Sequence, residues 1–594
     1  MSQETKICQN CKKEFVIEPD DFDFYNKIKV PPPTWCPDCR LQRKMAFKNE
    51  RTFYRRKCSL CNRNIIAVFP ENTPFPVFCP PCWWSDKWST LDYGMAYDFS
   101  KSFFIQFYKL LKKVPRISLY IDYPRTINSE YIHVTGPLKN CYLVIQGEDD
   151  ENCFYSYNIA HSKDSIDCFN TFYITNSYGL IDCEHCDHVF FSVNCRDSIE
   201  IYFSKNLRNC MDCFGCINLR NKKYHIFNKP YSKEDYFQFI KNWNSGSYKE
   251  VKKYKETTQN LYLNFPNRYM EGHHNVNVSG NYIFNSKNTL HSFDIINAEN
   301  CKYCRQFNMP LVKDCYDYSD WGNDASLVYE SINTGEHISN VKFSYGPYVG
   351  ENISYCDTTF SSSNIFGCIS FRKKPYCILN KQYTKEEYEE LVPKIIKHMN
   401  EMPYVDKKGR VYKYGEFFPP ELSPFCYNET IAQEYFPLSK AEAESKGYSW
   451  KDPEERNYQI DIKSEDIPDH IKDVKDDIVG KIIECAHKGE CNERCTTAFK
   501  IIEPELQYYK RMNLPLPRLC PNCRHYQRLK QRNPLKLWHR KCQCAGEKSE
   551  NGVYKNTIEH FHGKEPCPNE FETTYAPDRP EIVYCEKCYL QEVI

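Results

Sequence analysis

The sequence has little glycine, almost no net charge and no long apolar run. Glycine accounts for 21 of 594 residues, and the formal charge is +1, so any electrostatic preference must come from local patches. No run of about 18 apolar residues and no apolar signal core occur, which excludes a membrane span and predicts a cytosolic protein.

Motifs for common catalytic chemistry are also missing. The sequence has no Gly-rich loop that cradles phosphate, no His-Glu-x-x-His and no convincing nucleophile with a paired base. These absences favour a binding or scaffold protein over an enzyme.

Cysteine and aromatic residues are abundant instead. The 34 cysteines often form Cys-x-x-Cys pairs, and because the cytosol keeps thiols reduced, bound metal explains them better than disulfides do. Aromatic residues make up 15% of the chain, which suits stacked strands better than helix bundles.

Residues 1–90 contain two sets of four cysteines with the spacing of closed tetrahedral zinc sites. The sets are Cys8, Cys11, Cys36 and Cys39, then Cys58, Cys61, Cys79 and Cys82. Such short segments cannot bury enough apolar area alone, so we expect metal to decide whether these tandem zinc ribbons fold. Redox-active dithiols are the alternative.

Residues 481–594 repeat this pattern and predict two more tandem ribbons. The third set is Cys491, Cys495, Cys520 and Cys523, with Cys485 and His487 as spare ligands; the fourth is Cys542, Cys567, Cys585 and Cys588. Cys544 is an alternative to Cys542, and His560 and His562 of the insertion at 545–566 are further candidates. The sequence thus predicts four structural Zn²⁺ ions.

The stretches Phe24-Tyr25-Asn26-Lys27 and Val30-Pro31-Pro32-Pro33-Thr34-Trp35-Cys36-Pro37-Asp38-Cys39-Arg40 resemble the family called the probable zinc-ribbon domain, a short treble-clef-like unit. The resemblance covers Cys8 to Lys44 and implies the first ligand set without implying catalysis. The whole chain resembles multi-zinc-ribbon proteins of candidate-phyla bacteria, most closely over 376–381 and 491–541. That group brings no established activity with it.

The middle of the chain is duplicated, because Phe214–Tyr236 returns almost unchanged at Phe366–Tyr388. Asn or Asp corners recur about every 12 residues through both copies, which we assign to 131–260 and 261–402. Asn tolerates left-handed corners, so the pattern predicts a parallel β-helix or β-solenoid with two steps per coil. A pair of antiparallel sandwiches is the alternative. After each copy, Ser232 and Thr384 should cap a helix.

The predicted fold is therefore mainly β: a duplicated solenoid core flanked by paired zinc ribbons, with short helices after each copy. Residues 91–130 form a connector with a helix near Phe103 to Lys113, and 403–480 a charged surface linker. The cluster from Cys183 to Cys216 fits either a packing ladder or another metal site.

The stretch 506–541 contains ten basic residues, no acidic one, and interleaved aromatics. Basic groups neutralise phosphates and aromatics stack on bases, so it predicts contact with RNA or DNA. The predicted nucleic-acid residues are Arg518, Arg524, Arg528, Lys530, Arg532, Lys536, Trp538 and Arg540. A weaker counterpart runs from Arg40 to Lys57. A solvated helix, or a basic face docked on the acidic stretch 452–477, is the alternative.

Two other functions stay open. Acidic sets such as Asp182, Glu184, Asp187 and Asp197, or Asp314, Asp317 and Asp320, would suit a β-helix carbohydrate-active enzyme. The Tyr-rich flank would suit a scaffold that binds other proteins without nucleic acid.

Overall fold

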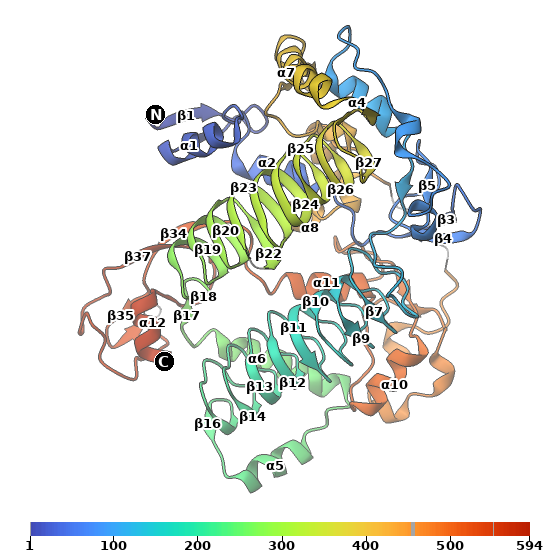
Figure 1. The fold of residues 1–594 in the computed structure, drawn as a ribbon. Helices are drawn as coiled ribbons and strands as arrows, with labels where there is room; N and C mark the ends of the chain where they lie inside the picture. The colour runs from blue at the N-terminus through green and yellow to red at the C-terminus, as the bar shows by residue number, and fades with distance from the viewer. Residues whose placement is uncertain (1, 310, 453–457, 550–551, 594) are drawn as a thin grey trace.

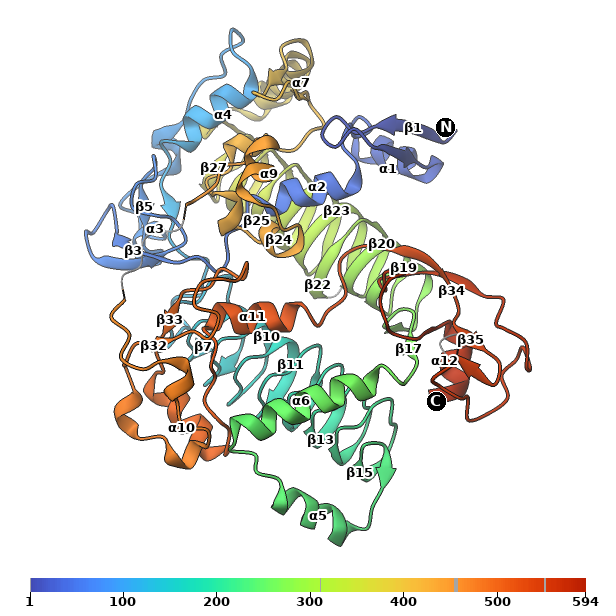
Figure 2. The same cartoon turned by 180° about the vertical axis from the view of Figure 1, so that it is seen from behind.

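The computed structural model describes residues 2–593 except 310, 453–457 and 550–551. Two stacks of parallel β-strands lie side by side, and helices and cysteine-rich segments surround them (Figure 1). Seen from behind, the helix α11 (Pro521–Leu529) lies between the two stacks (Figure 2). The fold is thus mainly β, with cysteine clusters toward both ends of the chain.

The first stack is built from short strands that pair in parallel. They are β7 (Leu138–Lys139), β8 (Ile145–Glu148), β9 (Asp150–Glu151), β10 (Tyr157–Ala160), β11 (Phe169–Thr175), β12 (Glu184–Phe190), β13 (Arg196–Tyr202), β14 (Met211–Phe214) and β15 (Lys223–Ile226). From Ile127 onward, paired residues lie 12 positions apart, as in Tyr157↔Phe169. One 12-residue step therefore completes a circuit, so the predicted two steps per coil are wrong, and so is the antiparallel sandwich.

The backbone of this stack turns through the left-handed region at every third residue, for example at Asn140, Leu143 and Gln146. This conformation costs roughly 1–2 kcal/mol for most L-residues, and Asn and Asp adopt it most readily. The residue after each corner faces the interior, where Cys183 and Cys186 are almost fully buried. Cysteine, valine, isoleucine and leucine fill this narrow interior.

Side-chain ladders tie neighbouring circuits together. Asn128 donates to Asn140 at 3.0 Å, Asn140 to Asn152 at 3.1 Å, and Asn152 to Asp164 at 3.0 Å. The predicted role of Asn at the corners is confirmed. The thiols of the interior cysteines donate to backbone carbonyls; the Cys183 sulfur, for example, is 3.3 Å from the Ile181 oxygen. These contacts agree with the packing ladder.

The second stack is longer-stranded and less regular. Its strands are β18 (Gly272–His273), β19 (Val276–Phe284), β20 (Lys287–Ile296), β21 (Ala298–Lys302), β22 (Arg305–Met309), β23 (Val312–Gly322), β24 (Ala325–Lys342), β25 (Tyr345–Ser354), β26 (Asp357–Phe366), β27 (Ile369–Arg372) and β28 (Cys377–Ile378). The offset grows to 14 between Glu299 and Lys313 and to 13 between Val312 and Ala325. The extra residues are bulges, which explains the uneven spacing of the corners.

Each stack ends in the same way, which explains the duplicated sequence. Asn228 accepts from the Ile217 amide at 2.8 Å and donates to its carbonyl at 2.9 Å, and Asn380 does the same to Ile369 at the same distances. A hairpin follows each, formed by β15 with β16 (Lys229–Pro230) and by β28 with β29 (Lys381–Gln382).

The helices after the hairpins begin where the sequence predicted. Ser232 caps α5 (Lys233–Asn242), and Thr384 forms a capping box with Glu387 at the start of α7 (Lys385–Glu401). The first copy adds α6 (Tyr248–Tyr262), which lies along the first stack (Figure 2).

Four cysteine modules surround the stacks. Module 1 has β1 (Glu4–Ile7), β2 (Glu14–Ile17), α1 (Pro19–Ile28) and α2 (Pro37–Met45); module 2 has β3 (Tyr54–Lys57), β4 (Asn64–Ala67), β5 (Val77–Phe78) and α3 (Pro80–Trp83). Module 3 has β32 (Ile483–Glu484), β33 (Ala498–Phe499), α10 (Glu503–Arg511) and α11; module 4 has β34 (Trp538–Lys541), β35 (Cys544–Ala545), β36 (Lys548–Ser549), β37 (Glu570–Thr573), β38 (Val583–Tyr584) and α12 (Glu586–Val593).

Short elements connect these parts. They are η1 (Thr90–Tyr93), α4 (Phe103–Leu111), β6 (Arg116–Ile117), β17 (Asn267–Arg268), β30 (Tyr404–Val405), β31 (Val411–Tyr412), η2 (Pro420–Leu422), η3 (Tyr427–Glu429), α8 (Ala432–Tyr435), α9 (Lys440–Ser445), η4 (Ser464–Asp466), η5 (Ile471–Asp473) and η6 (Asp476–Ile478). The segment predicted as a surface linker is anchored by aromatics: Phe418 is buried and stacks on Phe107 at 4.7 Å. Residues 453–457 of that linker lie outside the described part.

Candidate metal centres and the cleft between the stacks

Each module brings four thiols together. The groups, in which all sulfur atoms lie within 4.8 Å of one another, are Cys8, Cys11, Cys36 and Cys39; Cys58, Cys61, Cys79 and Cys82; Cys485, Cys495, Cys520 and Cys523; and Cys542, Cys567, Cys585 and Cys588. All cysteines of the chain are free thiols. Such a set can hold a metal ion.

One hydrogen bond recurs in all four modules. The backbone amide of the third cysteine donates to the sulfur of the first: Cys36 to Cys8 at 3.2 Å, Cys79 to Cys58 at 3.3 Å, Cys520 to Cys485 at 3.2 Å and Cys585 to Cys542 at 3.1 Å. In each case the third cysteine is the residue immediately before a helix. The hydrogen bond therefore joins the start of that helix to the first cysteine of the module.

The sulfur spacings fit a tetrahedral ion. Sulfur ligands at about 2.3 Å from zinc stand roughly 3.8 Å apart. Cys11 and Cys36 are 3.7 Å apart, and Cys61 and Cys79 are 3.9 Å apart. The backbone amide and guanidinium of Arg63 also donate to Cys61 and lower its pKa to about 6, which favours a thiolate.

In module 3 the structure groups Cys485 where the sequence analysis placed Cys491. Cys485 follows β32, which pairs with β33 as β1, before Cys8, pairs with β2. The apolar strand before Cys485 was the signal that the spacing argument missed. Cys491 still lies 3.7 Å from Cys523.

In module 4 the quartet contains Cys542 and leaves out Cys544. Cys544 lies in a second group with His560, His562 and Cys588. The two groups have Cys588 in common.

The helix α2 buries its basic residues against the second stack. Arg40 pairs with Asp317 at 2.7 Å, Lys44 donates to the Asp317 carbonyl, and Lys48, just after the helix, pairs with Asp320 at 2.9 Å. Arg43 pairs with Glu330 inside the same interface, where both side chains are fully buried.

The helix α11 does the same on the first stack, where it takes up three of the predicted nucleic-acid residues. Arg524 and Arg528 both pair with Asp167, at 2.5 and 2.7 Å. Arg532 pairs with Asp182 at 3.0 Å and also with Asp294 of the second stack. All three arginine side chains are at most 7% exposed, so internal carboxylates take the place that phosphates were predicted to fill.

The other predicted nucleic-acid residues are dispersed. Arg518 donates to the Ile467 and Pro468 carbonyls, Lys530 pairs with Glu493, and Arg540 donates to the Ala576 carbonyl. Lys536 is exposed and lies 5.1 Å from the ring centre of Trp538. The structure does not gather these groups into one basic face.

Modules 2 and 4 contact the entrances of the stacks. β5 of module 2 pairs with β6, just before the first stack, and β38 of module 4 pairs with β17, just before the second. Arg116 of β6 also pairs with Asp357 of the second stack at 2.5 Å.

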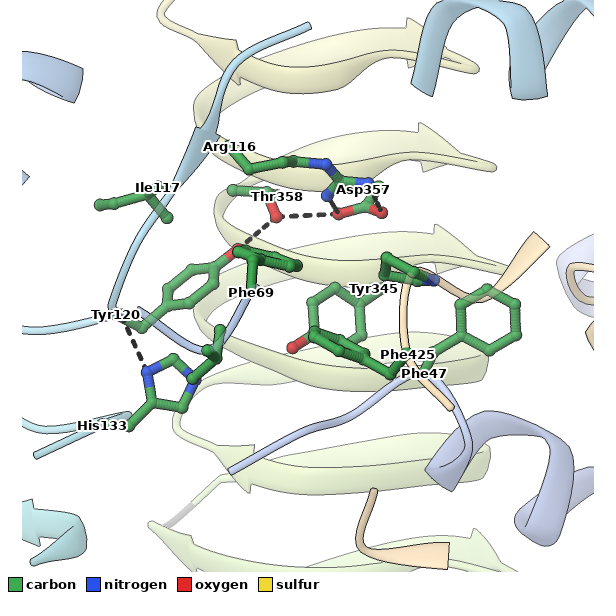
Figure 3. A pocket seen from close by; sticks show the side chains of 12 residues that line it. Phe47, Phe69, Arg116, Ile117, Tyr120, His133, Tyr345, Asp357, Thr358 and Phe425 are labelled. Carbon is green, nitrogen blue, oxygen red and sulfur yellow. Dashed lines mark hydrogen bonds and ion pairs between the residues drawn. The ribbon is translucent and has the colours of Figure 1, made fainter. Parts of the chain in front are cut away.

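That junction encloses a small cavity of about 20 Å³ (Figure 3). Tyr120 donates through its hydroxyl to Thr358, and its backbone amide donates to His133 Nδ1 at 3.1 Å. Burial lowers the pKa of His133 to about 3, so the imidazole is neutral. The cavity has room for about one water and serves packing.

A much larger cleft, of about 700 Å³, separates the stacks. Glu148, His161 and Tyr173 line it from the first stack, and Trp321 and Glu336 from the second. The remaining aromatic lining residues are Trp84, Tyr120, Tyr123, Phe172, Tyr282, Phe284, Tyr348 and Phe360.

Two carboxylates of this cleft take part in no ion pair with another described residue. Among the described residues, neither Glu148 nor Glu336 forms an ion pair; Glu336 accepts from the Tyr348 hydroxyl at 2.6 Å. Burial raises the pKa of Glu148, Asp149 and Glu336 add to the shift, and Arg125 opposes it. By contrast, Asp182, Asp317 and Asp320 of the predicted acidic sets are taken up by internal pairs.

No protein-family model and no curated protein matches the chain. One solved structure with some similarity is the crystal structure of a "putative acetyltransferase from Desulfovibrio desulfuricans G20", at 9% identity over 42% of this chain and 63% of that chain, with a TM-score of 0.09. That likeness carries no argument. No helix among the described residues is both long and apolar enough to cross a membrane.

Proposed function

We propose that this protein is a zinc-dependent binding protein of the cytosol, in which metal modules fix two β-solenoids side by side and the cleft between them takes a cationic ligand. The observation that carries the proposal is that α2 of module 1 and α11 of module 3 are each held to a stack by buried ion pairs.

Zinc is the ion we assign to the four quartets. Ligand sets made only of thiolates with tetrahedral spacing are typical of structural zinc, and four protein ligands leave no open position for catalysis. Each such site contributes an apparent binding free energy on the order of 10 to 16 kcal/mol to folding. We therefore assign the four modules as zinc ribbons.

The solenoid assignment rests on the parallel 12-residue register and on the Asn ladders. A solenoid coil contacts only its neighbours, so its outer faces are rigid and repetitive. Two such faces form the walls of the cleft, and α11 lies between the two stacks (Figure 2).

The cleft chemistry favours a positively charged ligand, and we assign it to a basic segment of a partner protein. Aromatic faces attract cations, and the effect grows when water is excluded. Among the described residues Glu148 and Glu336 form no ion pair, so a cationic ligand can pair with them and favour their charged forms, and the volume lies within the range of specific ligand sites. We do not extend the proposal to RNA or DNA, because the arginines predicted to contact them form internal pairs.

The test uses the full-length zinc-loaded protein and an oligoarginine peptide. Because Trp84 and Trp321 line the cleft, we expect saturable quenching of tryptophan fluorescence, and none with oligoglutamate. Glu148→Gln and Glu336→Gln should each weaken binding by about tenfold, equal to about 1.4 kcal/mol. Glu351→Gln, at an exposed position that does not line the cleft, is the matched control.

Two outcomes would overturn the proposal. One is equal binding of both peptides or an unchanged affinity in both Gln variants. The other is a protein that keeps its fold, by circular dichroism and proteolysis, after a chelator has removed all metal.

A further inference from the structure

Module 4 holds more metal-ligating side chains than one ion needs. Its quartet is Cys542, Cys567, Cys585 and Cys588, and a second group of Cys544, His560, His562 and Cys588 also lies within 4.8 Å. We propose that module 4 binds two zinc ions bridged by the Cys588 thiolate, an inference that rests on the proposed zinc sites and adds a fifth ion to them.

The hydrogen bonds of the two histidines aim their lone pairs into this group. His560 Nε2 is 2.9 Å from Glu592 Oε2, and a carboxylate only accepts, so Nε2 carries the proton. His560 Nδ1 is then unprotonated, and it lies 3.2 Å from the Cys544 sulfur and 3.5 Å from the Asn556 amide nitrogen.

His562 uses the opposite nitrogen to the same end. Its Nδ1 is 2.6 Å from the Glu565 carbonyl, which fixes the proton there, and its Nε2 lies 3.3 Å from the Cys588 sulfur. A histidine that gives one N–H to a carboxylate or carbonyl and turns the other nitrogen inward is the usual arrangement around zinc.

The carboxylate behind His560 is itself held in place. Glu592 is fully buried and accepts from the Tyr554 hydroxyl at 2.5 Å and from the Thr557 amide at 2.7 Å. Hydrogen bonds from three donors offset the cost of burying this carboxylate and fix its position, so it can orient His560.

Charge also favours two ions. One Zn²⁺ in the all-thiolate quartet leaves a buried complex of net charge −2. Two Zn²⁺ with the five thiolates of both groups have net charge −1, with neutral histidines. The bridging thiolate lowers the total charge that the module has to bury.

Metal content of the full-length protein tests this. We expect five zinc ions per chain by mass spectrometry of the metals, and four in both His562→Ala and Cys544→Ser, because each removes a ligand of the second group only. His539→Ala, an exposed histidine of the same module, should keep five and is the matched control.

X-ray absorption tests the bridge itself. A zinc–zinc scattering path at roughly 3 to 4 Å should be present in the wild type and absent in His562→Ala. Four ions in the wild type, or five without that path, would overturn the bridged site and leave the four quartets standing. Fewer than four would overturn the proposed zinc sites as well.

Discussion

The helices α2 and α11 occupy equivalent places in modules 1 and 3, yet each docks on a different stack. Arg40 and Arg524 each follow the last cysteine of their quartet, and each pairs with a buried aspartate, Asp317 or Asp167. Module 1 thus reaches across to the second stack, while module 3 reaches back to the first. The exchange makes the two halves of the chain dependent on each other.

The difference between them lies in how each reaches the other stack. Arg532 of the α11 side spans Asp182 and Asp294, one in each stack. Lys48 of the α2 side pairs with Asp320, and a second residue, Glu50, accepts from Tyr157 of the first stack at 2.8 Å. Arg532 alone bonds to both stacks, because its planar guanidinium presents several donors. Lys48 bonds to the second stack and reaches the first only through Glu50.

The largest expected effect comes from removing the arginines of α2 and α11 that pair with a buried aspartate. Arg40→Ala and the double variant Arg524→Ala/Arg528→Ala should each destabilise the protein by about 3 to 5 kcal/mol, because each leaves a buried aspartate, Asp317 or Asp167, without a cation. Thermal unfolding at fixed zinc concentration measures it. Lys397→Ala, in an exposed helical pair, is the control and should stay near wild type. A large loss in one helix variant alone would break the equivalence of the two helices.

A pH series of wild type and Glu505→Gln tests the buried carboxyl beside Arg524 of α11. Burial raises the pKa of Glu505 to about 7 against the pull of Arg524, so the fold favours its protonated form. Stability from this group is complete below its unfolded pKa, near 4.3, and is lost as pH rises through 7. From pH 5 to 8 we expect a loss of about 2 to 3 kcal/mol that Glu505→Gln lacks. Identical pH profiles would contradict the assignment.

Exchanging the two spanning residues tests their difference. Arg532→Lys should cost about 1 to 2 kcal/mol, because one ammonium cannot hold both Asp182 and Asp294 in a fork. Lys48→Arg should cost less, since Glu50 already carries the second contact. Chemical unfolding of both variants measures the contrast, and equal costs would refute it.

The smallest effect concerns the exposed charge ladder of the first stack. Glu151 pairs with Lys139 at 2.8 Å and Lys163 at 3.1 Å across neighbouring circuits, in water. Glu151→Gln should cost less than about 1 kcal/mol, and the cost should vanish in 1 M salt. The buried pairs of α2 and α11 should keep their effect at that salt concentration.

The sequence predicted the parts of the fold that depend on repetition. The duplication, the Asn corners and the cysteine spacing are local patterns, and they located both stacks and most ligands. The circuit length was missed, although small residues recur at every third position, as in Cys183, Cys186, Val189 and Ser192. The Asn and Asp corners at 12-residue spacing are a more conspicuous pattern than this three-residue period.

Function was harder to predict because it depends on contacts between distant segments. The basic residues of 506–541 look free in the sequence, and only the fold brings Asp167 and Asp182 to Arg528 and Arg532. Likewise, nothing local shows that Glu148 and Glu336 face one cleft from two stacks. Ion pairs between residues more than 300 positions apart produce no periodic pattern in the sequence.

The paired asparagines Asn228 and Asn380 have a consequence for assembly. An uncapped final circuit would offer unsatisfied amides and carbonyls to the first circuit of another molecule, and such edges grow into fibres. Each asparagine occupies the amide and carbonyl of one residue there, Ile217 or Ile369, and a hairpin pairs with the last strand. Loss of both side chains would turn a self-contained coil into a template for end-to-end polymerisation.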